Sequence, residues 1–187
     1  MKKKIRKNIQ IVISGMPGSG KSTIAEHLAK KFKLKHYSVG DFMRKLARKQ
    51  HISLLELSRK AEKSPKTDYE LDNMTKKLRK KKNFVLDSRI GWHFLPKAIK
   101  IFVKVDVKEA AKRIFKEKRG IEKENLSYTK TMENIKRRIR SERMRYRKYY
   151  GIDVEDLSNY DIIIDTSDLS INQMRILAEK TLSFFLM

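Results

Sequence analysis

A three-layer α/β/α fold on a five-stranded parallel sheet is the architecture that the sequence predicts. Five short apolar segments alternate with segments of helical periodicity, an order typical of parallel βαβ units with helices on both faces of a sheet. The strand segments are continuous apolar runs, as expected where both faces are covered. Gly15, Pro17, Gly18 and Gly20 cluster directly after the first of these runs. Ligands bind at the carboxyl ends of the strands in such sheets, which is where this cluster falls.

The expected strands are short runs of β-branched, aromatic and other apolar residues. The first, IQIVIS, leads into the glycine cluster, and the third ends at Asp87. Short apolar runs bounded by turn residues are typical of buried strands. The expected strands are 9–14, 35–39, 83–86, 99–105 and 160–165.

The expected helices show apolar residues three or four positions apart, or begin with capping residues. Ser53 with Glu56, and Thr67 with Glu70, have the spacing of a capping box, so we expect helices to begin at these serine and threonine residues. The last helix is amphipathic and closes the fold. The expected helices are 21–32, 41–49, a helix from 53, 67–82, 107–119, 127–149 and 171–185.

Composition narrows the classes of function. The 187 residues are 40% hydrophobic, enough for one domain over residues 1–187 with a buried core. The absence of cysteine excludes a disulfide scaffold, a zinc finger, an iron–sulfur site and a thiol nucleophile. A formal net charge of +24 favours polyanionic partners. No apolar stretch approaches the ~18 residues that span a bilayer, so we expect a cytoplasmic protein without a membrane partner.

The glycine cluster fits the pattern G-x-x-x-x-G-K-[ST] at every position. Its glycines allow a tight turn whose backbone N–H groups point at an anion, and the following helix adds its positive end. Lys21 is expected to reach the β- and γ-phosphates of a nucleoside triphosphate, and Ser22 to ligate Mg²⁺. The pattern leaves the phosphate acceptor open. The residues expected to bind ATP are Gly15, Met16, Pro17, Gly18, Ser19, Gly20, Lys21, Ser22 and Thr23.

Two arginines at the carboxyl edge of the sheet indicate a site for a second anion. Arg44 follows the second strand and Arg89 follows the third, so both are expected near the glycine-rich loop. Asp87 ends the third strand, where an acidic residue can hold a magnesium-bound water in P-loop enzymes. The alternative is that Asp87 only caps the next turn.

The last third of the chain adds a further group of charged residues. Arg138, Glu142 and Arg145 are spaced by four and three positions and share one helix face. Without further evidence, the simpler interpretation is that these three residues form a row of ion pairs on a surface helix. Arg113 and Arg119 lie near the end of the preceding helix. We expect the two helices to form a cationic hairpin that closes over the phosphates.

Six segments, in order and over nearly the whole chain, together form a recognisable pattern: 15–23 (GMPGSGKST), 37–44 (YSVGDFMR), 67–72 (TDYELD), 85–89 (VLDSR), 141–153 (SERMRYRKYYGID) and 157–167 (LSNYDIIIDTS). The run from Arg145 to Ser167 is the most specific part, because a generic P-loop ATPase has no reason to contain it. With these segments the chain resembles the nucleoside monophosphate kinases, and most closely the cytidylate kinases of the archaeal type.

The resemblance implies an adenylate-kinase-like fold with a short lid, a region for the nucleoside monophosphate at about 40–82 and a lid region at about 113–150. It implies ATP and CMP or dCMP as substrates and Mg²⁺ as cofactor. We expect a monomer. The catalytic residues implied by position are Lys21, Arg89, Arg119 and Arg145. The residues implied at the acceptor are Ser38, Gly40, Arg44, Asp68, Asp72, Arg89, Arg138 and Glu142, with the cytosine base near Asp68 and Asp72. The residues implied at the metal are Ser22 and Asp87.

Three functional hypotheses remain open at this point. The first is an enzyme that transfers a phosphoryl group from ATP to CMP or dCMP without a general base, because the acceptor phosphate is already anionic. The second is a P-loop ATPase that binds RNA or ribosomal particles through basic runs such as 76–82 (KKLRKKK). The third is a kinase for another acceptor, such as UMP, AMP or a nucleoside.

Overall fold

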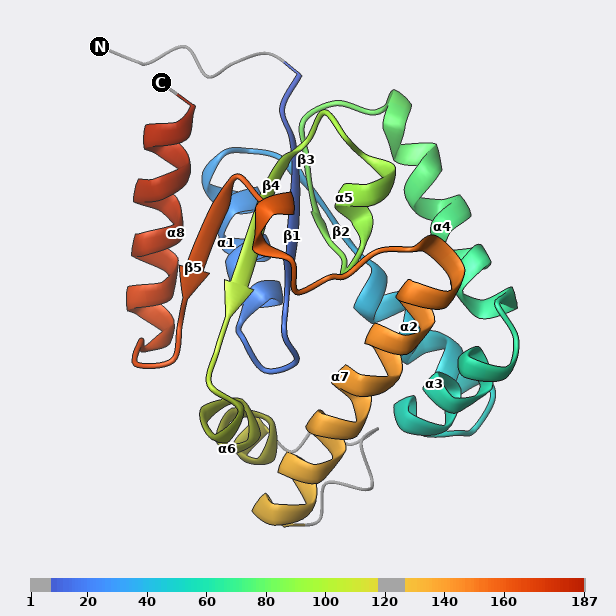
Figure 1. Cartoon of the computed structure of the whole chain (residues 1–187). Coiled ribbons are helices and arrows are strands. Elements are labelled where there is room, and N and C mark those ends of the chain that lie inside the picture. Colours follow the sequence, from blue (N-terminus) through green and yellow to red (C-terminus); the bar gives the residue numbers. More distant parts are fainter. Residues whose placement is uncertain (1–7, 118–126, 187) are drawn as a thin grey trace.

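Five parallel strands form one sheet in the order β2-β3-β1-β4-β5 (Figure 1). The computed structural model describes residues 8–117 and 127–186. The central strand β1 pairs with β3 on one side and β4 on the other, with Ile13 opposite both Asp87 and Ile101. The three-layer fold with five parallel strands is thus confirmed. The strands are β1 (Gln10–Gly15), β2 (Lys35–Ser38), β3 (Phe84–Asp87), β4 (Ile99–Lys104) and β5 (Ile162–Asp165).

The helices lie within two or three residues of the expected bounds, except for the helix expected at 67–82. The short helix α5 and the two 3₁₀ turns, η1 and η2, were not expected, and the expected helix 107–119 runs past the last described residue before the gap. The helices are α1 (Lys21–Lys31), α2 (Val39–Lys49), α3 (Leu54–Lys63), α4 (Lys66–Lys77), η1 (Leu78–Lys80), α5 (Gly91–Phe94), α6 (Val107–Glu117), α7 (Tyr128–Tyr150), η2 (Leu157–Asn159) and α8 (Ile171–Phe185).

One of the two expected capping boxes is present. The Ser53 hydroxyl accepts from the Glu56 N–H at 3.0 Å, and the Glu56 carboxylate accepts from the Ser53 N–H at 2.7 Å. The prediction for Thr67 was wrong, because α4 begins one residue earlier, with Pro65 at the cap and no side-chain cap. Proline fixes φ near the helical value, and Pro65 has φ of −73°. The helix also ends at Lys77, before η1.

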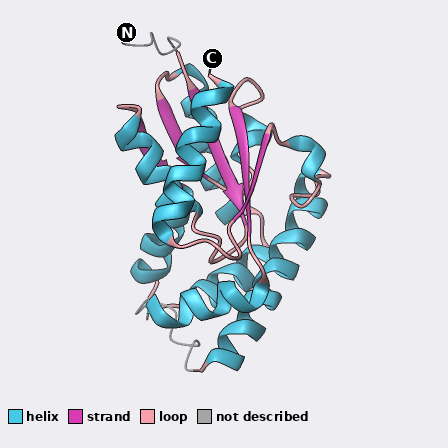
Figure 2. Cartoon of the chain, turned by 90° about the vertical axis from the view of Figure 1, so that its left-hand side faces the viewer, coloured by secondary structure: helices cyan, strands magenta, loops and turns pink. Residues whose placement is uncertain are grey.

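Alternate residues of the strands face two separate cores. Ile11 and Ile13 of β1 pack in one core with side chains of α1 and α8, whereas Val12 packs in the other with Trp92 and Phe102. Both faces are therefore covered, as the continuous apolar strands require. Figures 1 and 2 show a further group of helices beyond the carboxyl ends of the strands, where α2, α3, α6 and α7 lie. Within the described residues, no helix combines the length and the apolar character needed to cross a membrane.

Candidate active site

The loop between β1 and α1 has the backbone geometry of an anion cradle. Gly20 caps α1 with a φ of 83°, a left-handed conformation that glycine adopts without steric cost. A Cβ added to Gly15 would overlap the Val103 carbonyl oxygen, so this position too requires glycine. The cap of α1 has no side-chain hydrogen bond. The N–H groups of its first turn therefore remain available to phosphate oxygens.

Ser22 and Asp87 meet beside this cradle. The parallel pairing of β1 with β3 places Asp87 at the end of its strand, opposite Ile13, and the Ser22 hydroxyl donates to the Asp87 carboxylate at 2.5 Å. Mg²⁺ in nucleotide sites takes one or two protein oxygens and completes its shell with phosphates and water. The pair fits that ion. Over 8–117 and 127–186, no group of three or more His, Cys, Asp or Glu side chains offers another metal site.

Lys21 is the first residue after the glycine-rich loop, and it interacts electrostatically with the charged side chains of Asp87, Arg89, Arg138 and Glu142. Burial lowers the pKa of its ammonium group to about 8, with Asp87 opposing this shift and Arg89 adding to it. The group is still largely protonated at pH 7. Phosphate oxygens close to Lys21 would stabilise its charged form and raise the pKa again, which suits a lysine that binds the donor phosphates.

Arg89 is held rigidly at the mouth of the loop. Its Nη1 donates to the Gly15 carbonyl oxygen, and its Nε lies 3.0 Å from the Glu142 carboxylate. The Ser14 hydroxyl donates to the Arg89 carbonyl oxygen at 2.6 Å. The remaining nitrogen, Nη2, is buried and has no hydrogen-bond partner among the described residues. A buried, unpaired guanidinium N–H is costly, and an anion in the adjoining cavity would satisfy it.

Glu142 on α7 connects several of these cations. It is 6% exposed and accepts from Arg89 and, at 3.2 Å, from Arg138. Burial disfavours its charge, but Arg89, Arg138 and Arg145 outweigh that effect and hold the pKa of the Glu142 carboxyl below its ordinary value. An ionised Glu142 therefore orients the guanidinium groups while leaving them a net positive charge.

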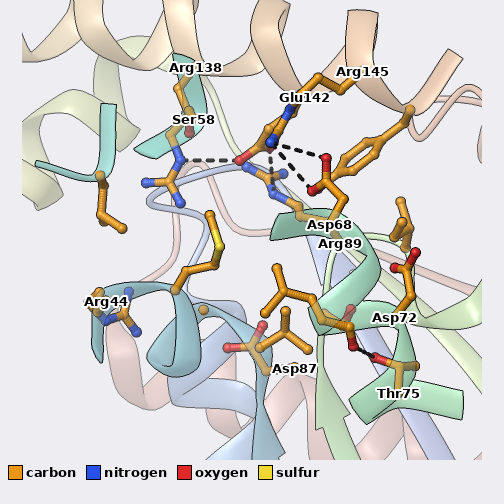
Figure 3. A pocket seen from close by; sticks show the side chains of 18 of the residues that line it. Arg44, Ser58, Asp68, Asp72, Thr75, Asp87, Arg89, Arg138, Glu142 and Arg145 are labelled. Atoms are coloured by element: carbon orange, nitrogen blue, oxygen red, sulfur yellow. Dashed lines mark hydrogen bonds and ion pairs between the residues drawn. The ribbon is translucent and has the colours of Figure 1, made fainter. Parts of the chain in front are cut away.

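One cavity adjoins the loop, the end of β3 and helices α2, α3, α4 and α7 (Figure 3). Its free volume is about 70 Å³, below the roughly 300 Å³ at the small end of small-molecule sites. The expected residues that line it are Lys21, Ser22, Gly40, Arg44, Asp68, Asp72, Asp87, Arg89, Arg138, Glu142 and Arg145.

Ser38 is not among these lining residues. Its hydroxyl caps α2 by accepting from the Asp41 N–H at 3.1 Å, which is the ordinary role of serine at this position. The cap uses the Ser38 oxygen only as an acceptor, and the binding of the acceptor nucleotide by Ser38 stays a prediction. Arg44, one turn further along α2, lines the cavity while its Nη2 donates to the Asp41 carboxylate.

Asp68 and Arg145 form a buried pair on the acceptor side. Nη1 of Arg145 lies 3.4 Å from each Asp68 oxygen, and both side chains are at least 96% buried. Arg145, implied as a catalytic residue in the lid region, lies against α4 in the structure, and its catalytic role stays a prediction. Its Nε has no hydrogen-bond partner within the described chain, so it presents a second unpaired donor.

Asp68→Asn is expected to change how stability depends on pH between about 4 and 6. Burial raises the pKa of Asp68 from its ordinary 3.8 to about 6, although Arg145 opposes the rise. The folded protein thus binds this proton more tightly than the unfolded chain, and the contribution of Asp68 to stability falls as the pH rises through this range. Denaturant unfolding at several pH values should show the variant gaining stability relative to wild type as the pH rises. A difference that is independent of pH would contradict the raised pKa.

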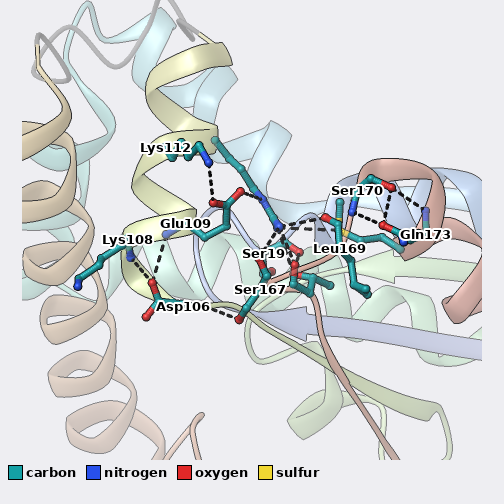
Figure 4. A network of polar contacts seen from close by, with 12 residues as sticks. Ser19, Asp106, Lys108, Glu109, Lys112, Ser167, Leu169, Ser170 and Gln173 are labelled. Carbon is teal, nitrogen blue, oxygen red and sulfur yellow. Dashed lines mark hydrogen bonds and ion pairs between the residues drawn. The ribbon is translucent and has the colours of Figure 1, made fainter.

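A second cavity, of about 340 Å³, lies on the other side of the loop, between α6 and α8. Arg113 lines it but is committed to protein partners. Its Nη2 donates to the carbonyl oxygens of Thr166 at 2.6 Å and Leu169 at 3.3 Å, and its Nε donates to Glu109 at 3.1 Å. Figure 4 shows the surrounding polar contacts, with Glu109 of α6 facing Leu169 of the loop after β5. Arg113 therefore links α6 to the loop after β5, and the expected closure of the two helices over the phosphates stays a prediction. Arg119 lies outside the described residues.

Sequence reasoning missed the residues that support the site. Tyr150 donates to Asp72 at 2.5 Å, and the Tyr160 hydroxyl, which donates to the Val154 carbonyl oxygen, lies 3.3 Å from the Ser14 oxygen. The only available signal was that both tyrosines fall in the segments 141–153 and 157–167, which carry the most specific part of the resemblance. Tyrosines in such runs are usually core residues, so their hydrogen bonds become visible only in the structure.

Comparison with known proteins gives one family for almost the whole chain. The model of the cytidylate kinase-like family matches residues 10–168. A cytidylate kinase of Sulfurisphaera tokodaii is 38% identical over 179 residues, covering 94% of this chain and 96% of the relative. A cytidylate kinase of Methanosarcina barkeri is 35% identical over 173 residues, covering 90% and 92%.

Solved structures share the fold at much lower identity. A shikimate kinase from Bacteroides thetaiotaomicron superposes with a TM-score of 0.66 at 14% identity, over 96% of this chain and 99% of that one. A shikimate kinase from Acinetobacter baumannii, in complex with shikimate, gives a TM-score of 0.61 at 18% identity, over 96% and 93%. At these identities the similarity concerns the P-loop kinase fold alone.

Proposed function

The chain belongs to the cytidylate kinase-like family, and we propose that it transfers the γ-phosphoryl group of ATP to CMP or dCMP, giving ADP and CDP or dCDP. The observation that carries the proposal is one cavity lined both by Lys21 and Ser22 of the donor loop and by Arg44, Arg89 and Arg138. A protein that only hydrolyses ATP has no need of a second set of cations at that place.

The donor and acceptor phosphates repel each other, and fixed positive charges let them meet. Lys21 would bind the donor phosphates together with the N–H groups of the loop, and Arg44 and Arg89 would bind the acceptor phosphate. The acceptor oxygen is already anionic near neutral pH, so no side chain has to remove a proton. Catalysis then consists of positioning and charge neutralisation.

The remaining assignments concern the metal, the lid and the assembly. Ser22 and Asp87 would hold Mg²⁺, which when bound supplies positive charge to the β- and γ-phosphates. Residues of about 40–82 would form the acceptor region and about 113–150 the lid, with Arg119 contributing to the transition state. The residues proposed for the donor, the metal and the acceptor all belong to one chain, and the protein is proposed to act as a monomer.

A coupled assay of ADP formation across all ribo- and deoxyribonucleoside monophosphates tests this function. We expect CMP and dCMP to give the highest kcat/KM, and ATP hydrolysis without an acceptor to be slow because the closed site excludes water. Preference for another monophosphate would overturn the acceptor assignment. ATP turnover that requires RNA and no monophosphate would favour an RNA-dependent ATPase.

A further inference from the structure

We propose that Ser14, at the end of β1, is a positioning residue for Arg89. Its hydroxyl holds the main chain of Arg89 so that the free nitrogen of the guanidinium group is directed at the acceptor phosphate, and Tyr160 in turn restrains that hydroxyl. The inference rests on the proposed function, because it concerns a cation that binds the acceptor in that reaction.

Ser14 is a polar residue in a strand that is otherwise apolar at its buried positions. The three residues before it, Ile11, Val12 and Ile13, are fully buried, and Ser14 is 1% exposed. A hydroxyl buried in this way costs free energy unless it has a hydrogen-bond partner. Its partner is the Arg89 carbonyl oxygen, at 2.6 Å. Packing alone would be met by a small apolar side chain, so the hydroxyl points to a role in this contact.

Arg89 is attached to the end of β1 through both its main chain and its side chain. The Arg89 carbonyl oxygen accepts from Ser14, and Nη1 donates to the carbonyl oxygen of the next residue on β1, Gly15. The N–H of Ser88, just before Arg89, donates to the Ile13 carbonyl oxygen at 3.0 Å. Because Gly15 is the first residue of the donor loop, these contacts fix Arg89 relative to the donor phosphates.

The direction of Nη2 depends on these attachments. Glu142 takes Nε, and Nη2 is buried without a partner among the described residues. If the main chain of Arg89 shifted, Nη1 could keep its contact with Gly15 only by turning the guanidinium plane, and Nη2 would turn with it. Ser14 is not among the described residues that line the cavity beside the donor loop (the acceptor cavity). It would therefore act through Arg89 and not on the substrate itself.

Tyr160 restrains the Ser14 hydroxyl from the other side. The Tyr160 hydroxyl donates to the Val154 carbonyl oxygen at 2.9 Å, and its oxygen lies 3.3 Å from that of Ser14. Its ring packs against Phe102, with the ring centroids 4.9 Å apart, so the hydroxyl has little room to move. Of the two oxygens near Ser14, the Arg89 carbonyl oxygen is the closer, and the Ser14 proton is directed to it.

A double-mutant cycle with Ser14→Ala and Arg89→Ala separates positioning from a structural role. Ser14→Ala is expected to lower kcat/KM for CMP about tenfold, less than the roughly 10²-fold that a misplacement of about 1 Å can cost. The KM for ATP should stay within about twofold of wild type. In the Arg89→Ala background the same change should have less than about a twofold effect, because no guanidinium group is left to position.

The dissociation constant for CMP, measured by calorimetry on the full chain, gives a readout that does not need turnover. Ser14→Ala should weaken CMP binding in the wild-type background and leave it unchanged in the Arg89→Ala background. If the assay of all monophosphates identifies another acceptor, the cycle is run with that nucleotide. The acceptor assignment can then fail while the positioning role of Ser14 is still tested.

Two further variants complete the experiment. Ile162→Val removes one methylene group from the buried core on β5 and should lower the thermal midpoint without changing either readout, which controls for a small loss of stability. Tyr160→Phe should cause a smaller fall in kcat/KM for CMP than Ser14→Ala, again only while Arg89 is present, and it serves if Ser14→Ala does not fold.

Three results would overturn the inference. The first is a kcat/KM for CMP that Ser14→Ala leaves at the wild-type value. The second is a fall by the same factor in the wild-type and the Arg89→Ala backgrounds, which would show that Ser14 only supports the fold. The third is a rise in the KM for ATP as large as the change seen with CMP, which would show that Ser14 acts on the donor loop.

Discussion

The Lys21→Ala variant is expected to keep less than about one hundredth of the wild-type turnover, the scale of removing one charge-stabilising donor. Lys21 is the cation at the start of α1 that lines both the acceptor cavity and the cavity beside α6 and α8. Among the described residues, no other lysine lines the cavity that Lys21 shares with Arg44 and Arg89. Its loss would remove one of the positive charges proposed to stabilise the transferring phosphoryl group.

The pH dependence of ATP binding gives this prediction a second readout. The pKa of Lys21 is about 8, chiefly because of burial. In the free protein this group loses its proton above pH 8, whereas bound phosphates favour the charged form. The affinity for ATP should therefore fall as the pH rises above about 8 in wild type, and this fall should be absent in Lys21→Ala.

Lys30→Ala provides the control, because Lys30 is exposed on the same helix and should leave both turnover and the pH profile unchanged. Turnover by Lys21→Ala within tenfold of wild type would remove Lys21 from the catalytic group.

The parts of the fold that the sequence could predict are those specified by neighbouring residues. The strand IQIVIS and the loop after it carry their signals within a dozen positions, and the capping box at Ser53 needs only four. Thr67 has the same local pattern, but Pro65 already sets the start of that helix. The Thr67–Glu70 spacing and Pro65 predict different first residues for this helix, and the spacing alone does not show which of the two determines the start.

The candidate site was predicted in its location and only partly in its contacts. The cations at the ends of β2 and β3 gather at one edge because parallel strands end together, and Arg44 and Arg89 do line one cavity. The pairs Asp68–Arg145 and Asp72–Tyr150 join residues 77 and 78 positions apart, through the docking of α7 on the acceptor helices, which no local pattern specifies. Ser38 lies at the predicted edge, but its hydroxyl is already used as a helix cap.

Arg89→Ala is expected to lower kcat/KM for CMP by at least about 10²-fold while leaving the KM for ATP nearly unchanged. The guanidinium group uses Nη1 on Gly15 and Nε on Glu142, and Nη2 is the nitrogen left for an acceptor phosphate. Arg89→Lys should be almost as defective, because one ammonium group cannot make these three contacts from one position. Arg175→Ala, which changes an exposed arginine of α8, is the control.

The Arg89→Ala variant can lose activity through lower stability as well as through a lost phosphate contact. Glu142 is buried, and among the neighbouring groups Arg89 contributes most to keeping its carboxyl ionised. Removing Arg89 leaves that carboxylate with less compensation and should lower the thermal midpoint. Adding Glu142→Gln removes the uncompensated charge, so the double variant should recover much of the midpoint. It should not recover activity, since the donor for the acceptor phosphate is still missing. Near-normal CMP phosphorylation by Arg89→Ala, or recovery of turnover together with stability in the double variant, would show that Arg89 acts on the fold and not on the phosphate.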